Sequence, residues 1–272
     1  MTGESTRNPQ WLTWLKDQVS FAADMGQAVQ ALRSAGIPDP AIAAALDTLR
    51  PRGSALSDGR LAPPPLLARA PANLRKLDAP RLDLYALDDF LSADECERIS
   101  ALAAQHLQPS PLSSTTRDTA FRTSRTCVLA HLRSPIAAEL DDRICRTLGI
   151  RAAYGEAIQA QRYDVGQQFK AHTDWFVPGS DDYARLAGMR GNRTWTFMVY
   201  LNEGMQGGGT RFTAIDFTVT PKAGMALLWN NLQPDGSPNP LTWHCGEPVT
   251  AGHKVIITKW FRVLGDGPVL HE

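Results

Sequence analysis

Cysteine is scarce in this 272-residue chain, its charges cancel, and it has no long apolar run. No two of its four cysteines form a C-x-x-C pair, and their spacing matches neither a zinc site nor a disulfide framework; they are Cys96, Cys127, Cys145 and Cys245. The 28 lysines and arginines equal the 28 aspartates and glutamates, which argues against a strongly basic nucleic-acid-binding protein. No segment has the apolar length of a bilayer span, and the first residues lack a charged-then-apolar secretion signal. We therefore expect a cytoplasmic protein with reduced thiols and with neither a nucleic-acid nor a membrane partner.

Apolar residues near the start of the chain recur at helical spacing. Residues 11–50 carry them at intervals close to i, i+3 and i+4, as amphipathic helices do. Gly36 is expected to end one helix, and Pro40 to lie in the first turn of the next. We predict an N-terminal helical extension over residues 1–55, which is too small to form a stable core alone. It is expected to dock on the main domain, to mediate dimerisation or to recruit a protein substrate.

A segment rich in proline and alanine follows, and residues 56–80 are predicted to be an extended linker. The pattern then predicts one α+β domain over residues 81–272. Helices are expected at residues 92–107, where Ser92 and Glu95 form a capping box, and at 135–148. Strands are expected at 82–86, 125–132, 156–164, 168–175, 194–201, 209–213, 216–219, 225–230 and 254–263. Helices followed by many short strands indicate a β-sandwich or jelly roll.

Three residues carry the clearest chemical signal. His172 and Asp174 are two positions apart in a predicted strand, so both side chains are expected on one face. His244, much later in the chain, can complete three ligands on one side of a metal. Two imidazoles and one carboxylate form the facial triad of non-haem Fe(II) oxygenases, whose open positions bind a co-substrate and O2. For the His-x-Asp pair taken alone, the alternative is that it lies on a surface strand and binds no metal.

Lys254 lies in a strongly β-prone run that continues Val-Ile-Ile-Thr. A lysine in such a strand usually faces solvent at an edge. The alternative is that it points inward and binds the far carboxylate of a dicarboxylate co-substrate, because pairing with a carboxylate is one of the few ways to bury an ammonium group. Tyr163 and Tyr200 each offer a phenol to the same carboxylate.

Several longer motifs occur in order around these residues. Residues 163–174 follow the pattern Y-x-x-G-x-x-[YF]-x-x-H-x-D, and residues 193–212 contain Arg193-Thr194, then Y-L-N and G-G-x-T-x-F. Residues 221–224 match P-x-x-G, residues 244–254 match H-x-G-x-P-V-x-x-G-x-K, and Trp260 follows the lysine by six positions. Arg122 begins an R-T-S element. With these motifs, residues 82–263 resemble the prolyl 4-hydroxylase group of 2-oxoglutarate- and Fe(II)-dependent dioxygenases.

The resemblance implies a double-stranded β-helix, a cupin-like jelly roll, that holds Fe(II) through His172, Asp174 and His244. It implies that 2-oxoglutarate chelates the iron and that its far carboxylate is bound by Lys254. The residues expected to help bind 2-oxoglutarate are Tyr163, Tyr200, Thr210 and Trp260. O2 is the other co-substrate, ascorbate is an accessory reductant, and the products are succinate, CO2 and a hydroxylated aliphatic carbon.

The substrate itself is less constrained than the chemistry. We expect a prolyl or other residue of a peptide or protein, with a free amino acid or small metabolite as the alternative, and a non-catalytic dioxygenase-like binding protein as a third hypothesis. Trp175, Arg122 and Trp243 are candidate substrate contacts because they neighbour the site in sequence or motif. The chain departs from the family pattern at Val255, where tryptophan is common, and in the long charged insert over residues 177–192. That insert follows Asp174 directly, where we expect substrate choice to be made.

Overall fold

The computed structural model of the chain describes residues 12, 31–38, 40–42, 45, 71–79, 82–111, 118–187, 190–233 and 235–264. In the predicted N-terminal extension, residues 31–34 and 40–42 are helical, and Gly36 after the first of them has a φ of +78°. Apart from residues 12, 35–38 and 45, the rest of the extension lies outside the described residues, as do residues 56–70 of the predicted linker. None of the helices found in the described ranges has both the length and the apolar character to cross a bilayer.

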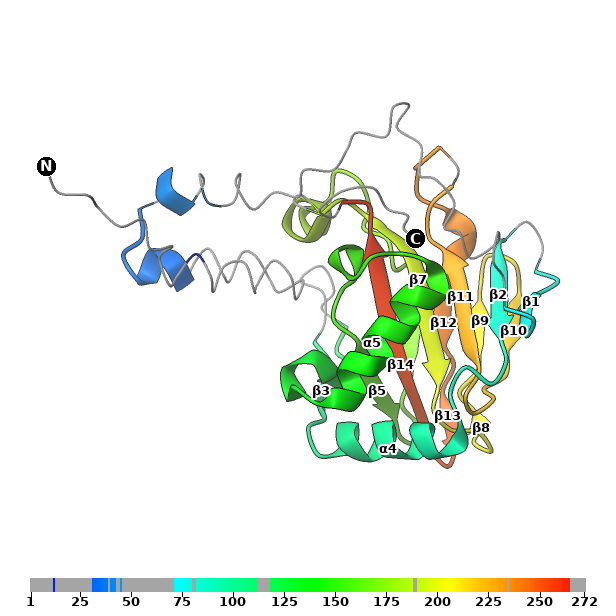
Figure 1. Cartoon of the computed structure of the whole chain (residues 1–272). Helices are drawn as coiled ribbons and strands as arrows, with labels where there is room; N and C mark the ends of the chain where they lie inside the picture. Colours follow the sequence, from blue (N-terminus) through cyan, green and yellow to red (C-terminus); the bar gives the residue numbers. More distant parts are fainter. Residues whose placement is uncertain are drawn as a thin grey trace, which may run out of the picture.

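A large antiparallel sheet is the centre of the domain (Figure 1). Its strand order is β1-β2-β11-β7-β14-β5-β4-β3. The strands are β1 (Leu74–Lys76), β2 (Leu84–Leu87), β3 (Gln108–Pro109), β4 (Arg125–Val128), β5 (Gln159–Tyr163), β7 (Arg193–Tyr200), β11 (Ala226–Asn230) and β14 (Lys254–Arg262). All nine residues of β14 are buried, because this β-branched and aromatic strand lies inside the sheet with a layer on each face.

A smaller sheet packs against one face of the large one. Its order is β10-β9-β12-β6, formed by β6 (Phe169–His172), β9 (Thr210–Phe212), β10 (Phe217–Val219) and β12 (His244–Gly246). The short strands β8 (Gln206–Gly207) and β13 (Val249–Ala251) pair beside it. The two sheets make the sandwich that the pattern of short strands predicts, and the predicted α+β class is confirmed.

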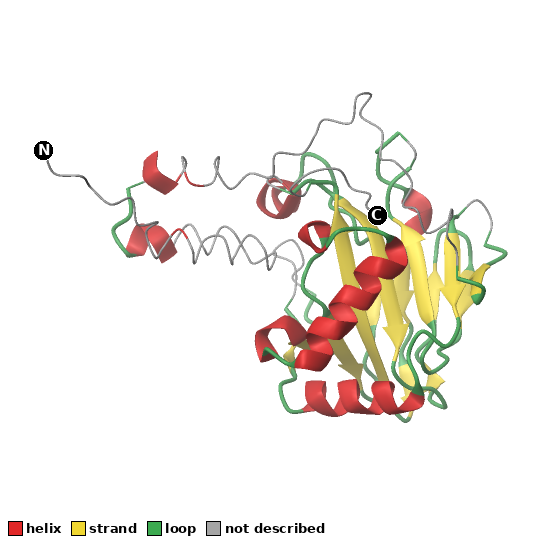
Figure 2. Cartoon of the chain, viewed as in Figure 1, coloured by secondary structure: helices red, strands yellow, loops and turns green. Residues whose placement is uncertain are grey.

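Two long helices cover the opposite face of the large sheet, as Figure 2 shows. They are α4 (Ala93–Ala104) and α5 (Pro135–Leu148). Successive side chains along each central strand therefore point alternately into two separate hydrophobic cores. On β7, Phe197 and Val199 belong to the core under the helices, whereas Met198 and Tyr200 belong to the core between the sheets.

The predicted helices and strands are found with small shifts at their ends. The helix predicted over 135–148 has those bounds, and the predicted capping box is present, since the Ser92 hydroxyl accepts from the Glu95 amide and the Glu95 carboxylate accepts from the Ser92 amide. The strand predicted over 125–132 stops at Val128 and continues as a 3-10 turn, η2 (Leu129–Leu132). Strand β1 lies inside the segment predicted to be a linker over residues 56–80. The end of that segment is therefore an edge strand of the large sheet and not a free connection.

One turn depends on the absence of a side chain. Gly224 ends the Pro-x-x-Gly turn before β11 with a φ of +77°, and a Cβ placed there would lie 2.1 Å from the carbonyl oxygen of Leu91. Gly224 O accepts the amide of Leu91. The turn thereby fixes the start of β11 against the segment that leads into α4.

We expect Ser92→Ala to lower the free energy of unfolding by about 1 kcal/mol, because the substitution removes a helix N-cap that accepts a backbone hydrogen bond. Urea unfolding followed by circular dichroism measures the difference. Ser134→Ala is the matched control, because Ser134 caps α5 without a side-chain hydrogen bond and should cost much less. Equal losses in the two variants would contradict the assignment of the capping box.

Candidate metal and co-substrate site

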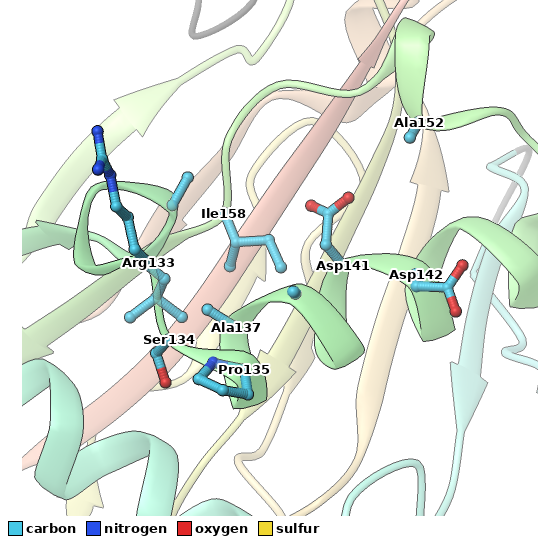
Figure 3. Close-up of a pocket in the computed structure, with 11 residues that line it drawn as sticks. Arg133, Ser134, Pro135, Ala137, Asp141, Asp142, Ala152 and Ile158 are labelled. Atoms are coloured by element: carbon cyan, nitrogen blue, oxygen red, sulfur yellow. The ribbon is translucent and has the colours of Figure 1, made fainter.

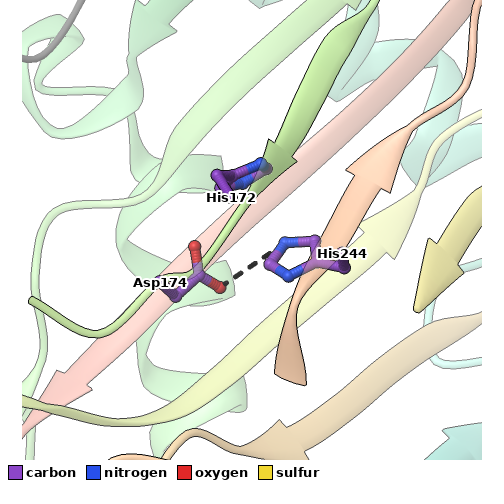
Figure 4. A group of neighbouring side chains, drawn as sticks. All are labelled: His172, Asp174 and His244. Carbon is purple, nitrogen blue, oxygen red and sulfur yellow. Dashed lines mark ion pairs between the residues drawn. The ribbon is translucent and has the colours of Figure 1, made fainter. Parts of the chain in front are cut away.

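Three potential metal ligands converge between the two sheets (Figure 4). His172 and His244 are register partners on β6 and β12, and their ring centroids lie 4.3 Å apart. Asp174 follows β6 by two residues, and its Oδ2 lies 4.0 Å from His244 Nε2. One ligand atom from each residue lies within 4.8 Å of the others, and no second group of three such ligands is found among the described residues. The structure therefore assembles the three residues that the sequence singled out.

The two histidines have the tautomer that a metal requires. His172 Nδ1 lies 2.9 Å from the Lys170 carbonyl oxygen, and His244 Nδ1 lies 2.8 Å from that of Thr242. A carbonyl can only accept, so Nδ1 of each ring carries a proton, and Nε2 is the ring nitrogen that remains for a metal. Burial, and then the neighbouring His244, lowers the pKa of His172 to about 3. The His172 ring is therefore neutral, and available as a ligand, at physiological pH.

Asp174 is held as a buried carboxylate. Its Oδ2 accepts a 2.7 Å hydrogen bond from the Thr196 hydroxyl. Burial opposes ionisation, but the nearby His244, His172 and Arg193 keep the pKa of Asp174 below its ordinary value. Two imidazoles and one carboxylate, with ligand atoms within 4.8 Å of one another, fit a ferrous ion.

The cavity that contains these ligands continues between the sheets to Lys254. Its lining residues are Gln161, Tyr163, Phe169, His172, Asp174, Met198, Thr210, Trp229, His244, Gly246, Lys254, Ile256, Thr258 and Trp260. Metal ligands and lysine therefore border one space. A molecule with a metal-binding group at one end and a carboxylate at the other matches this arrangement.

Lys254 points inward, so the alternative of a solvent-facing lysine is wrong. The residue is 2% exposed, and its Nζ lies 5.5 Å from the ring centroid of Tyr163 and 5.6 Å from that of Tyr200. In the described part of the chain no carboxylate oxygen lies within ion-pair distance of this Nζ. Burial lowers the pKa of Lys254 to about 8. A buried ammonium group in such surroundings favours an incoming anion.

The phenols near Lys254 have hydrogen-bond partners of their own. Tyr163 Oη donates to Gln161 Oε1 at 3.0 Å, and Tyr200 Oη donates to Thr210 Oγ1 at 2.8 Å. Because Thr210 accepts the tyrosine proton, its own hydroxyl proton remains available to a ligand in the cavity. Tyr163 and Thr210 line the cavity, whereas Tyr200 does not and contacts its lining through Thr210.

Trp260 lies at another part of the same wall. Its ring lines the cavity, and its Nε1 has no hydrogen-bond partner among the described residues. The guanidinium of Arg193 lies 4.0 Å from the Trp260 ring centroid, and Arg193 Nη1 donates to the Asp174 carbonyl at 3.4 Å. Arg193 therefore contacts both the Trp260 ring and the backbone of the candidate ligand Asp174.

The three candidate substrate contacts do not line the cavity. Arg122 lies 4.8 Å from the Phe169 ring centroid, beside the cavity. Trp175 uses its Nε1 to bond Asn239 O and Thr242 Oγ1, each at 3.2 Å, and so ties two segments together. Trp243 is 40% exposed, because it precedes the inward-facing His244 and extended backbone directs neighbouring side chains to opposite faces.

Other residues of the site were missed by the sequence reasoning. Ile256 and Thr258 lie between Lys254 and Trp260 at every second position of β14, and all four line the cavity. The period of two along a strand would have found them once Lys254 was placed inward. Thr196 carries no motif of its own and was found only through its hydrogen bond to Asp174.

The base of the insert after Asp174 is closed by reciprocal hydrogen bonds. The Phe176 amide donates to Asn192 Oδ1 at 2.8 Å, and Asn192 Nδ2 donates to the Phe176 carbonyl at 2.9 Å. Within the insert, η4 (Tyr183–Ala187) is a short π-helix. Arg262 on β14 donates to the carbonyls of Leu186 at 2.9 Å and Gly191 at 2.8 Å. The insert is thereby fastened to the central strand of the large sheet.

A buried carboxylate joins this anchor to the site. Glu156 accepts two 2.7 Å hydrogen bonds from Arg193, and its Oε1 lies 2.5 Å from Arg262 Nε. Burial alone would raise the pKa of Glu156, but the charges of Arg193 and Arg262 outweigh it and hold the pKa at about 2. One anion therefore keeps two buried guanidinium groups in place.

A larger hollow lies elsewhere, between η2 and the start of α5 (Figure 3). It measures about 490 Å³ and is bordered mainly by small apolar residues. Both carboxylates at its edge already have cationic partners, since Asp141 pairs with Lys259 and Asp142 pairs with Arg146. This hollow offers no set of converging metal ligands, so the site between the sheets is the better candidate for chemistry.

A His-Asp-His group beside a buried lysine inside a two-sheet sandwich defines an Fe(II)- and 2-oxoglutarate-dependent dioxygenase. Residues 158–262 match the family model of the 2OG-Fe(II) oxygenase superfamily. The chain is 31% identical over 207 residues to probable prolyl 4-hydroxylase 3 of Arabidopsis thaliana, covering 68% of this chain and 70% of that protein. It belongs to the prolyl 4-hydroxylase-like group of this superfamily.

Animal relatives are longer than the matched region. The chain is 33% identical to prolyl 4-hydroxylase subunit alpha-3 of Mus musculus over 190 residues, which are 68% of this chain and 34% of that one. Among solved structures, the 2OG complex of the viral collagen prolyl hydroxylase from Paramecium Bursaria Chlorella virus-1 has the same fold. It aligns with a TM-score of 0.52 and 23% identity, covering 66% of this chain and 96% of the viral one. The predicted jelly roll is thereby confirmed.

We expect Glu156→Gln to lower the free energy of unfolding by about 3–5 kcal/mol, because it leaves buried guanidinium groups without their anion. Since the pKa of Glu156 is about 2 in the folded chain and ordinarily 4.5, its contribution is complete above pH 4.5 and is lost as the pH falls toward 2. Urea unfolding at several pH values measures both effects. Asp83→Asn, which breaks an exposed pair with Lys76, is the control and should cost about 0–1 kcal/mol.

Proposed function

We propose that this protein hydroxylates a prolyl residue within a peptide or protein, using 2-oxoglutarate and O2 and releasing succinate and CO2. The observation that carries the proposal is the placement of the His172, Asp174 and His244 ligands and the unpaired Lys254 in one cavity. The names of its relatives support the choice of a prolyl substrate over other aliphatic carbons.

Each ligand residue has one task in this proposal. His172 and His244 would hold Fe(II) through Nε2, and Asp174 through a carboxylate oxygen. The iron, when bound, supplies the activation of O2 with electrons from 2-oxoglutarate. The hydrogen bonds that Nδ1 of each histidine donates and the one that Asp174 accepts would keep the ligands oriented before the metal arrives.

The other end of the cavity would bind the co-substrate. Lys254 would pair with the far carboxylate of 2-oxoglutarate, and the Thr210 hydroxyl would donate to it while Tyr200 fixes the Thr210 orientation. Tyr163 would contact the same carboxylate after releasing Gln161. The apolar side chains Met198 and Ile256 on the large sheet line the space between and exclude water from it.

Arg193 and the anchored insert would border the substrate. Trp260 Nε1 is a donor without a partner in the described part of the chain, so we keep Trp260 as a residue that would donate to an oxygen of 2-oxoglutarate. Arg122 lies beside Phe169 and would contact the peptide outside the cavity. We keep residues 1–55 as the candidate segment for recruitment or dimerisation, and we place the protein in the cytoplasm on the support of four free thiols.

We expect proline-containing peptides to gain one oxygen atom when incubated with the protein, Fe(II), 2-oxoglutarate and ascorbate in air, as measured by mass spectrometry. Without air, Fe(II) and 2-oxoglutarate should give a weak visible charge-transfer band. His172→Ala should abolish both signals, whereas His106→Ala, at an exposed position after α4, should keep them. Products on free proline alone would overturn the peptide substrate, and absence of the band together with absence of succinate would overturn the enzyme.

We expect the KM for 2-oxoglutarate to rise above about pH 8, because only the charged form of Lys254 attracts a carboxylate and its pKa is about 8 in the free protein. Once the pH exceeds the pKa, the rise should be about tenfold for each pH unit. Succinate release measured across the pH range gives the profile. Lys254→Met should raise this KM about 30-fold or more and flatten the profile. Lys222→Met, at an exposed lysine, is the control, and a pH-independent KM in the unchanged protein would contradict the assignment.

A further inference from the structure

A run of three side-chain hydrogen bonds leads from the large sheet to Asp174. Trp229 Nε1 donates to Asn231 Oδ1 at 3.0 Å, and Asn231 Nδ2 donates to Thr196 Oγ1 at 2.7 Å. Thr196 Oγ1 in turn donates to Asp174 Oδ2 at 2.7 Å. Trp229 and Thr196 are register partners on β11 and β7, so the pairing of the strands brings the members of the run together.

Every member of this run is sealed from solvent. Thr196 and Asn231 are 0% exposed, Trp229 is 1% exposed and Asp174 is 4% exposed. Buried polar groups keep their protein partners because water cannot replace them. Asn231 is also fixed through its backbone, since its amide donates to Thr194 O at 2.6 Å. The arrangement is therefore a permanent part of the fold.

The run has a single direction. An indole nitrogen only donates, so Trp229 faces the carbonyl oxygen of the Asn231 side chain and leaves its amide nitrogen for Thr196. That amide nitrogen also only donates, so the Thr196 oxygen must accept from it. The one proton of the Thr196 hydroxyl is then directed at Asp174. The donor character of Trp229 thus determines, through two neutral side chains, that Asp174 Oδ2 receives a hydrogen bond.

The same tryptophan also contacts a second candidate ligand. The Trp229 ring meets the His244 ring edge to face, with centroids 5.0 Å apart and an angle of 68° between their planes. Phe212 packs beside both rings, with its centroid 5.4 Å from that of Trp229 and 5.7 Å from that of His244. Rotation of Asp174 and tilting of His244 are therefore both limited by side chains outside the candidate ligand set.

We propose that Thr196 and Asn231 are positioning residues that orient the Asp174 carboxylate for the metal, with Thr196 acting directly and Asn231 acting through Thr196. The proposal rests on the proposed function, because it assumes that Asp174 is a metal ligand. A hydrogen bond to one oxygen fixes the plane of the carboxylate and occupies a lone pair, which leaves a defined direction for binding. Loss of an outer partner of this kind typically costs 10–100-fold in metal affinity.

The test is the affinity of the metal-free full-length protein for Co(II), followed by visible absorption of the bound ion. Thr196→Val keeps the shape of the side chain and removes the hydroxyl, so it should raise the Kd for Co(II) about 10–100-fold and alter the Co(II) spectrum. Thr196→Ser restores a hydroxyl and should recover most of the affinity. Thr194→Val is the matched control, because Thr194 is a buried threonine on the same strand whose hydroxyl bonds Phe261 O at 3.1 Å instead. It should leave the Kd unchanged.

A double-mutant cycle separates the role of Asn231 from general packing. Asn231→Leu alone should weaken Co(II) binding by less than Thr196→Val. Added to Thr196→Val, it should change the Kd no further, since its route to Asp174 is already broken. The proposal would be overturned if the fold-changes in Kd of the two single variants multiplied in the double variant. It would also be overturned if Thr196→Val and Thr194→Val had equal Kd values.

If the proposed function itself is wrong, the variants should show a different pattern of Co(II) affinities. In that case Asp174→Ala, which removes the ligand itself, would leave Co(II) binding by the protein unchanged. If Asp174→Ala abolishes binding while Thr196→Val does not weaken it, the metal site stands and the positioning role of Thr196 is wrong. Urea unfolding of the metal-free variants shows whether each is folded, so a change in Kd is compared only between folded proteins.

Discussion

The alternation of side chains along the central strands is the constraint on which the rest of this structure depends. β7 and β14 are covered on both faces, so each successive residue must suit a different environment. One face is mainly apolar and packs under α4 and α5, with Lys259 as an exception that pairs with Asp141 of α5. The other can be polar, because the smaller sheet supplies partners for it. A shift of one residue in register would exchange the two sets and place Lys254 beneath the helices.

This alternation also explains how many polar groups the interior tolerates. Thr196, Gln161 and Asn231 are buried between the sheets, and each has a side-chain partner there. Buried polar groups are stable when they are paired and costly when they are not. Lys254 and the indole nitrogen of Trp260 differ from them, because both face the cavity without a hydrogen-bond partner in the described chain. The unpaired groups mark where a ligand is expected.

Much of the fold and most of the site could be predicted from the sequence because the signals were local. The capping box at Ser92 and the alternation in β14 each occupy a few adjacent positions. The pairing of His172 with His244 was found through motifs, since no local pattern links residues so far apart. Asn231 and Thr196 could not be found, because a buried asparagine has the same local appearance as one in a turn. Trp243 does not line the cavity, because a residue next to an inward-facing ligand in an extended segment points to the opposite face.

The unpartnered ammonium group of Lys254 has a consequence for the lifetime of the protein. A ligand that binds only the folded chain stabilises it by mass action, and at a hundred times its Kd the gain is about 2.7 kcal/mol. A carboxylate that pairs with Lys254 would supply such a gain where the folded chain otherwise bears the cost of a buried charge. The population of unfolded chains, which proteases remove, would then fall as the supply of 2-oxoglutarate rises. The abundance of this enzyme would thereby depend on the concentration of its own co-substrate.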